Sequence, residues 1–332
     1  MTAELYKRLF KAIFSEDIMS LKKIADQIIL KEREINHEVL ADSLERIKYS
    51  EKPKKTNGFS QYVNSKPTGT MSGLPTTKRN NMQLVSFVPR EQLKHHMILN
   101  EKIEYRLFCI EKEYAAKDRL AKFNLMPKKK ILLYGEPGCG KTMAAERIAW
   151  NLGLPLLKVR FDSLLSSYFG ESASNLRTVF DYCKEEPAVL LLDECDFIAK
   201  SRTTGQDVGE APRIVNMLLT LLDEYNSSGL VIATTNLRVS LDEALFRRFD
   251  DIIEMPRPTK VEIEKLLKTT LSAIKTNNKI DWSFIADKLN GHSAASVVSV
   301  AQNAAKKCVL DGSIEVEQEH LMDIISSNLF KC

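Results

Sequence analysis

The chain has 332 residues, 44% of them apolar, and a formal net charge of +4, which is ordinary for a globular protein of one or two domains. Its apolar runs are much shorter than the roughly 20 residues that a membrane-spanning helix needs, and the amphipathic N-terminus lacks the long apolar stretch of a secretory signal. We therefore expect a cytoplasmic protein without a membrane span. The six cysteines are scattered, which argues against a disulfide framework or a zinc site.

The first 85 residues differ from the rest of the chain in composition. Residues 1–49 contain apolar side chains at helical spacing and predict a small helical unit that docks a substrate or a partner. Residues 50–85 are rich in Lys, Ser, Thr, Gly and Pro and predict a flexible linker. The linker is basic, because residues 51–100 hold eight Lys or Arg against two acids. Such a segment is either a solvated linker or a surface for nucleic acid, a membrane or an acidic protein face.

From residue 86 onward, short apolar runs alternate with longer helical patterns. Strands are predicted at Ile131–Tyr134, Leu156–Val159, Val189–Leu192, Leu230–Ala233 and Ile252–Met255. This alternation predicts an α/β core over residues 86–256, with a parallel sheet covered by helices on both faces. Only helical patterns follow Pro256 and Pro258, so residues 257–332 predict a separate helical subdomain.

The strand at Ile131–Tyr134 runs into a glycine-rich phosphate-binding motif and then a helical pattern. The motif G-x-x-x-x-G-K-[ST] is matched by Gly135, Glu136, Pro137, Gly138, Cys139, Gly140, Lys141 and Thr142. Its backbone N–H groups converge on phosphate oxygens, Lys141 reaches the outer phosphates and the Thr142 hydroxyl ligates magnesium. The motif predicts a nucleotide site with Mg²⁺.

A second acidic motif supports the nucleotide site. The apolar strand at Val189–Leu192 ends in Asp193 and Glu194. Asp193 is suited to hold the magnesium shell through water, and Glu194 is suited to orient and activate the attacking water.

These ordered motifs resemble those of the AAA branch of the AAA+ ATPases, over roughly residues 86–327. The resemblance implies an ATPase with ATP and Mg²⁺ as cofactors and with residues 257–332 as a helical lid. It also implies that Met143 and His292 contact the nucleotide and that Asn236, in "ATTN", positions the water. Arg247 and Arg248 resemble the family's arginine fingers, which reach the nucleotide of a neighbouring subunit. The two arginines are more closely spaced than usual, so the motif does not decide which is the principal finger.

The segment "SSYFGESASNLR" resembles the family's pore loop, with Tyr168 and Phe169 as the exposed pair and Gly170 as the turn. The resemblance implies a homo-oligomer, expected to be a hexameric ring, that threads a protein substrate past these aromatic rings. Two alternatives stay open. One is a nucleotide-dependent adaptor that serves an effector or protease partner through residues 1–85. The other is a nucleic-acid motor, against which the aromatic pore motif argues.

Overall fold

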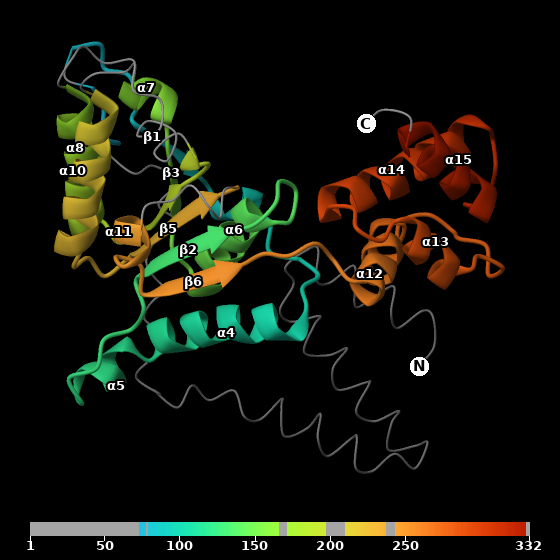
Figure 1. Cartoon of the computed structure of the whole chain (residues 1–332), viewed down its shortest axis with the longest axis horizontal. Helices are drawn as coiled ribbons and strands as arrows, with labels where there is room; N and C mark the ends of the chain where they lie inside the picture. The colour runs from blue at the N-terminus through green and yellow to red at the C-terminus, as the bar shows by residue number, and fades with distance from the viewer. Residues whose placement is uncertain (1–72, 78, 166–170, 197–209, 237–242, 330–332) are drawn as a thin grey trace, which may run out of the picture. The chain divides into compact units, whose positions relative to one another are not determined.

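The structure is a computed structural model that describes residues 73–77, 79–165, 171–196, 210–236 and 243–329 (Figure 1). The chain divides into two compact units, Met1–Pro67 and Thr68–Cys332, and every described residue belongs to the second. The predicted helical unit at 1–49, most of the predicted linker and the predicted pore loop lie outside the described residues.

The described part of the second unit contains a six-stranded sheet. Its strands are β1 (Val85–Val88), β2 (Lys130–Tyr134), β3 (Leu156–Val159), β4 (Val189–Leu192), β5 (Leu230–Thr235) and β6 (Asp251–Glu254). Their order in the sheet is β1-β3-β4-β5-β2-β6, and every neighbouring pair except β1 and β3 is parallel. The prediction of an α/β fold with a mostly parallel sheet is confirmed.

Strand β1 is the part of the sheet that the sequence did not predict. It pairs antiparallel with β3, with Val85 opposite Val159, at the edge of the sheet. Leu84 and Val85 are fully buried, although both stand within the range expected to be linker. A four-residue edge strand gives almost no periodic signal, because only Val85 of the four is fully buried.

Each central strand contributes to two hydrophobic cores on opposite faces of the sheet. Leu190 and Leu192 of β4 pack in one core with α8 (Glu171–Glu185) and α10 (Glu210–Glu224). Val189 and Leu191 pack in the other with α4 (Glu101–Ala115) and α6 (Lys141–Leu152). Successive side chains of a strand point to opposite faces, so a strand covered by helices on both sides is apolar throughout.

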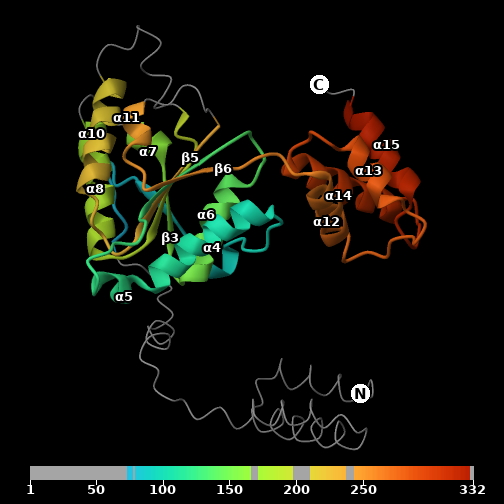
Figure 2. The ribbon, with the colours of Figure 1, turned by 60° about the horizontal axis from the view of Figure 1, so that its bottom comes forward.

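Shorter elements complete the α/β core. They are η1 (Arg90–Gln92), α5 (Lys117–Ala121), α7 (Phe161–Leu165) and α11 (Glu243–Phe246). Figures 1 and 2 both show α8 and α10 side by side, in agreement with their packing. Helix α4 is tied to α6 by Arg147, which donates to Glu104 at 2.6 Å. This ion pair lowers the pKa of Glu104.

The helical lid has a hydrophobic core of its own. It consists of α12 (Lys260–Thr270), α13 (Trp282–Lys288), α14 (Ala294–Leu310) and α15 (Gln318–Leu329). Local capping sets where these helices begin: Thr259 and Glu262 form a capping box on α12, and Ser293 caps α14. Among the described helices, none combines the length and the apolar character that crossing a membrane requires.

Replacing a central core side chain should destabilise the α/β core strongly. Leu191 on β4 is 0% exposed, so Leu191→Ala should lower the free energy of unfolding by about 2–5 kcal/mol through lost burial and a residual cavity. Urea denaturation followed by circular dichroism measures this. Leu125→Ala is the matched control, because Leu125 is 56% exposed and its truncation should cost little. Equal losses in the two variants would contradict the assigned core.

Candidate functional site

The phosphate-binding loop lies between β2 and α6 and can only be built with glycine at two points. Gly135 has φ +144°, and a Cβ there would run into the carbonyl oxygen of Met255, the residue after β6. Gly138 has φ +75°, and a Cβ there would lie 2.9 Å from the Ser293 Oγ of the lid. Both positions therefore exclude a side chain by conformation and by space.

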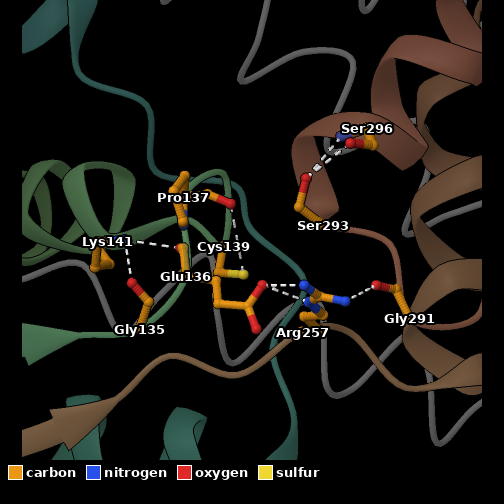
Figure 3. Close-up of polar contacts among 9 residues, drawn as sticks. All are labelled: Gly135, Glu136, Pro137, Cys139, Lys141, Arg257, Gly291, Ser293 and Ser296. Atoms are coloured by element: carbon orange, nitrogen blue, oxygen red, sulfur yellow. Dashed lines mark hydrogen bonds and ion pairs between the residues drawn. The ribbon is translucent and has the colours of Figure 1, made fainter. Parts of the chain in front are cut away.

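Lys141, the first residue of α6, is buried and folded against its own loop. Its Nζ donates to the carbonyl oxygens of Gly135 and Glu136, each at 2.8 Å (Figure 3). Burial lowers the pKa of Lys141, while the carboxylates of Asp196, Asp193 and Glu194 oppose that shift. The ammonium group is thus held at the loop, where outer phosphates are expected, by weak carbonyl acceptors that a phosphate can replace.

The other residues of the loop differ in exposure. Cys139 is buried, and burial raises the pKa of its thiol, so the thiol stays neutral beside an anionic ligand. Glu136 and Pro137 are exposed, whereas Gly140, Thr142 and Met143 are half-buried.

Asp193 is a buried carboxylate at the end of β4 that accepts three hydrogen bonds. The Thr142 hydroxyl donates to Oδ1 at 2.9 Å, the Thr234 hydroxyl donates to Oδ1 at 2.6 Å, and Lys158 Nζ donates to Oδ2 at 2.6 Å. Burial alone would raise the pKa of Asp193, but the bonds from Lys158, Thr234 and Thr142 outweigh it and the pKa is lowered. The carboxylate is therefore ionised, as a magnesium-shell ligand must be.

Glu194 has a backbone conformation that is rare for a residue with a side chain. Its φ is +56°, its side chain is exposed, and its N–H donates to Thr234 Oγ1 at 2.9 Å. A cavity of about 240 Å³ lies against Glu194 and Asp193. The strained turn aims the carboxylate outward from the sheet edge, where it can meet water.

Asn236, at the end of β5, is held by a carboxylate that the sequence did not single out. Asp196 accepts from the Asn236 backbone N–H at 2.8 Å and from its side-chain amide at 3.0 Å. The Thr235 hydroxyl donates to the same carboxylate at 2.6 Å. The structure thus places Asn236 one residue beyond β5, the strand that pairs with β4, and in contact with Asp196 of the acidic turn; its role in positioning water stays a prediction.

The lid contributes a second set of contacts to the phosphate loop. The Ala295 N–H donates to the Gly138 carbonyl at 3.0 Å. His292, in the turn before α14, has a buried Nδ1 with no hydrogen-bond partner among the described residues. A buried ring nitrogen of this kind is costly unless a ligand satisfies it, so the residues present fit a nucleotide base or ribose.

The two candidate finger arginines follow α11. Arg247 is exposed, whereas Arg248 is half-buried and donates from Nε to Asp223 of α10 at 3.2 Å. Tyr168, Phe169 and Gly170 lie outside the described residues. The residues on either side of that segment are held in the core, since Leu164 of α7 and Ser172 of α8 are fully buried.

Comparison with known proteins decides the family. Residues 131–257 match the model of the ATPase family associated with various cellular activities (AAA). An uncharacterized AAA family ATPase of Sinorhizobium fredii, y4kL, is 32% identical to the chain over 318 residues, covering 95% of this chain and 92% of the relative. The chain belongs to the AAA family of ATPases. It is a nucleotide-binding enzyme that hydrolyses ATP.

Three side chains of the AAA ATPase site were missed by sequence reasoning: Lys158, Thr234 and Asp196. Thr234 stands inside "ATTN", and Asp196 follows Glu194 by two positions, so their polarity next to the expected residues was an available signal. Lys158 offered none, because a lysine on a short strand is more often a solvated side chain.

Asp196 should act through Asn236, so its removal should damage hydrolysis more than nucleotide binding. Asp196→Ala is expected to lower kcat by about tenfold to a hundredfold, since a small misplacement of a positioning group is enough. Nucleotide affinity should stay within about twofold of the wild-type value, because Asp196 lies just beyond the carboxyl end of β4 and not in the phosphate loop.

Steady-state ATPase kinetics and titration with a fluorescent ATP analogue measure the two effects separately. Asp181→Ala, which removes a surface carboxylate paired with Lys184, is the matched control. A fall in affinity without a fall in kcat would show that Asp196 does not act through Asn236.

Proposed function

We propose that this AAA ATPase forms a ring, expected to be a hexamer, that remodels or unfolds protein substrates by threading them past its pore loops. One observation carries the proposal. Glu194 and Asn236 lie at the ends of β4 and β5, and the "YFG" segment stands in the sequence between α7 and α8, in which Leu164 and Ser172 are fully buried. Leu164 of α7 packs in the same hydrophobic core as Leu192 of β4, so a change at the nucleotide has a packed route toward α7.

ATP binding and cleavage are assigned to side chains at the carboxyl edge of the sheet. Lys141 would hold the outer phosphates, and Glu194 would orient a water molecule for attack on the γ-phosphorus. The bond between that phosphorus and the ADP oxygen breaks, and ADP and phosphate leave. Asn236 would position the same water, held in place by Asp196.

The residues present also fit Mg²⁺. Thr142 Oγ1 and Asp193 Oδ1 lie 2.9 Å apart, and hydroxyl and carboxylate oxygens are the ligands that this hard cation prefers. Thr142 would hold the ion directly and Asp193 through water. When bound, Mg²⁺ would offset the negative charge that develops on the phosphate oxygens.

Arg247 and Arg248 are proposed to complete the site of a neighbouring subunit, which makes the homo-oligomer a requirement for hydrolysis. Arg247 is exposed, whereas Arg248 is half-buried. An exposed guanidinium at this position is suited to meet a phosphate on another subunit.

Removing both arginines should abolish most hydrolysis and leave nucleotide binding intact. Arg247→Ala/Arg248→Ala is expected to lower kcat by about a thousandfold, because the guanidinium stabilises charge that develops only in the transition state. Arg177→Ala, which removes a surface ion pair with Glu224, is the control. In a mixture of this double variant with Glu194→Gln, each subunit can supply what its neighbour lacks, so activity should partly return. Failure of such mixing, or unchanged turnover in the double variant, would contradict a shared site.

The aromatic pair Tyr168–Phe169 provides the test of protein remodelling. Tyr168→Ala should leave basal ATP hydrolysis within about twofold and abolish ATP-dependent unfolding of a loosely folded protein substrate, because apolar grip is lost while the chemistry is retained. Tyr105→Ala is a matched control, since Tyr105 is 67% exposed on α4. Unfolding can be followed by loss of fluorescence from a fused fluorescent protein. Equal damage to ATPase and unfolding would point to a structural role for Tyr168.

We propose that residues 1–85 select the substrate or an effector or protease partner. The basic composition of residues 51–100 favours one second candidate, a motor that acts on nucleic acid. ATPase activity that rises with DNA in a salt-sensitive manner, and not with unfolded protein, would support that candidate over protein remodelling.

A further inference from the structure

Arg257 spans the connection between the α/β core and the lid. Arg257 lies three residues beyond the end of β6, between Pro256 and Pro258. The two prolines restrict the backbone conformation on both sides of it. A side chain on such a stiff connection has a well-defined direction. None of the motifs that identify the ATP site includes Arg257.

The guanidinium of Arg257 contacts both the phosphate loop and the lid (Figure 3). Its Nε donates to Glu136 Oε2 at 2.6 Å, and Nη2 donates to the same oxygen. Nη1 donates to the carbonyl oxygen of Gly291. Glu136 is the second residue of the phosphate loop, and Gly291 immediately precedes His292.

Independent contacts occur at the same place. Gly138 accepts from the Ala295 N–H, and its lack of a side chain makes room for Ser293. Gly291 has φ +84°, which turns its carbonyl within reach of Arg257. The phosphate loop and the turn before α14 are therefore in contact through backbone atoms as well as through Arg257.

We propose that Arg257 is a positioning residue that holds the lid turn at 289–293, with His292, against the phosphate loop. It sets the distance between the base end and the phosphate end of the ATP site. In the described part of the chain its hydrogen bonds go to Glu136 and Gly291 and not to Thr142, Asp193 or Glu194, so it acts on nucleotide affinity and not on bond cleavage. The inference rests on the ATP site of the proposed function and is independent of what the enzyme remodels.

The expected effect is modest, because the Arg257 and Glu136 side chains are 49% and 55% exposed and water screens the pair. Arg257→Gln should weaken nucleotide binding by about threefold to tenfold. Glu136→Gln should cost less, since its amide oxygen still accepts from Arg257 and the bond to Gly291 is kept. The double variant should be no weaker than Arg257→Gln alone, because both changes break one bridge.

The experiment uses the full-length protein and titrates each variant with a fluorescent ADP analogue, alongside steady-state kcat and KM for ATP. Lys260→Gln is the matched control, because Lys260 forms an exposed ion pair with Asp287 inside the lid, three residues from Arg257. Arg257→Lys gives a second measurement if the glutamine variant does not fold. A single ammonium group cannot span both partners, so an intermediate loss of affinity is expected.

The proposal requires a higher Kd and KM with kcat within about twofold of the wild type. Wild-type affinity in Arg257→Gln, or in Arg257→Lys, would overturn it. The proposal would also be overturned if the affinity losses of Arg257→Gln and Glu136→Gln multiplied in the double variant. A fall in kcat at unchanged Kd in Arg257→Gln would overturn it as well. If Glu194→Gln loses hydrolysis while the Arg257 variants keep wild-type Kd and KM, this inference is refuted and the proposed ATP site is still supported.

Discussion

The buried carboxylate of Asp193 is the interaction on which the rest of the site depends. A carboxylate removed from water must be compensated, and here the compensation comes from three different elements: Thr142 on α6, Lys158 on β3 and Thr234 on β5. Satisfying one charge thus aligns the helix after the phosphate loop with two strands of the sheet. Thr234 in turn accepts from the Glu194 N–H, so the backbone at the residue proposed to activate water belongs to the same network.

Much of this fold follows from simple features of the sequence. Strands β2, β4 and β5 contain continuous apolar runs, because helices cover both faces of the sheet, and such runs are visible without an alignment. The phosphate loop was equally clear, since its glycines, lysine and threonine stand at a spacing that the chemistry requires. The edge strand β1 was missed because four residues, of which only Val85 is fully buried, leave too little pattern.

The side-chain pairs that complete the site could not be predicted in the same way. Lys158 and Asp193 are 35 positions apart, Asp196 and Asn236 are 40 apart, and Glu136 and Arg257 are 121 apart. Nothing in local periodicity links residues at such separations, because they meet only through the strand order and the placement of the lid. The aromatic pair Tyr168–Phe169 stays a prediction, since it lies outside the described residues.

The close contact of Gly135 with the Met255 carbonyl has a practical consequence for chimeric enzymes. The first residue of the phosphate loop packs on the last residue before the connection to the lid, so neither can change shape alone. A hybrid that takes its lid from another family member by a joint before β6, at Asp250, would pair this loop with a foreign residue at position 255. The joint is better placed at Pro256, after Met255, so that the loop and its neighbour come from the same enzyme.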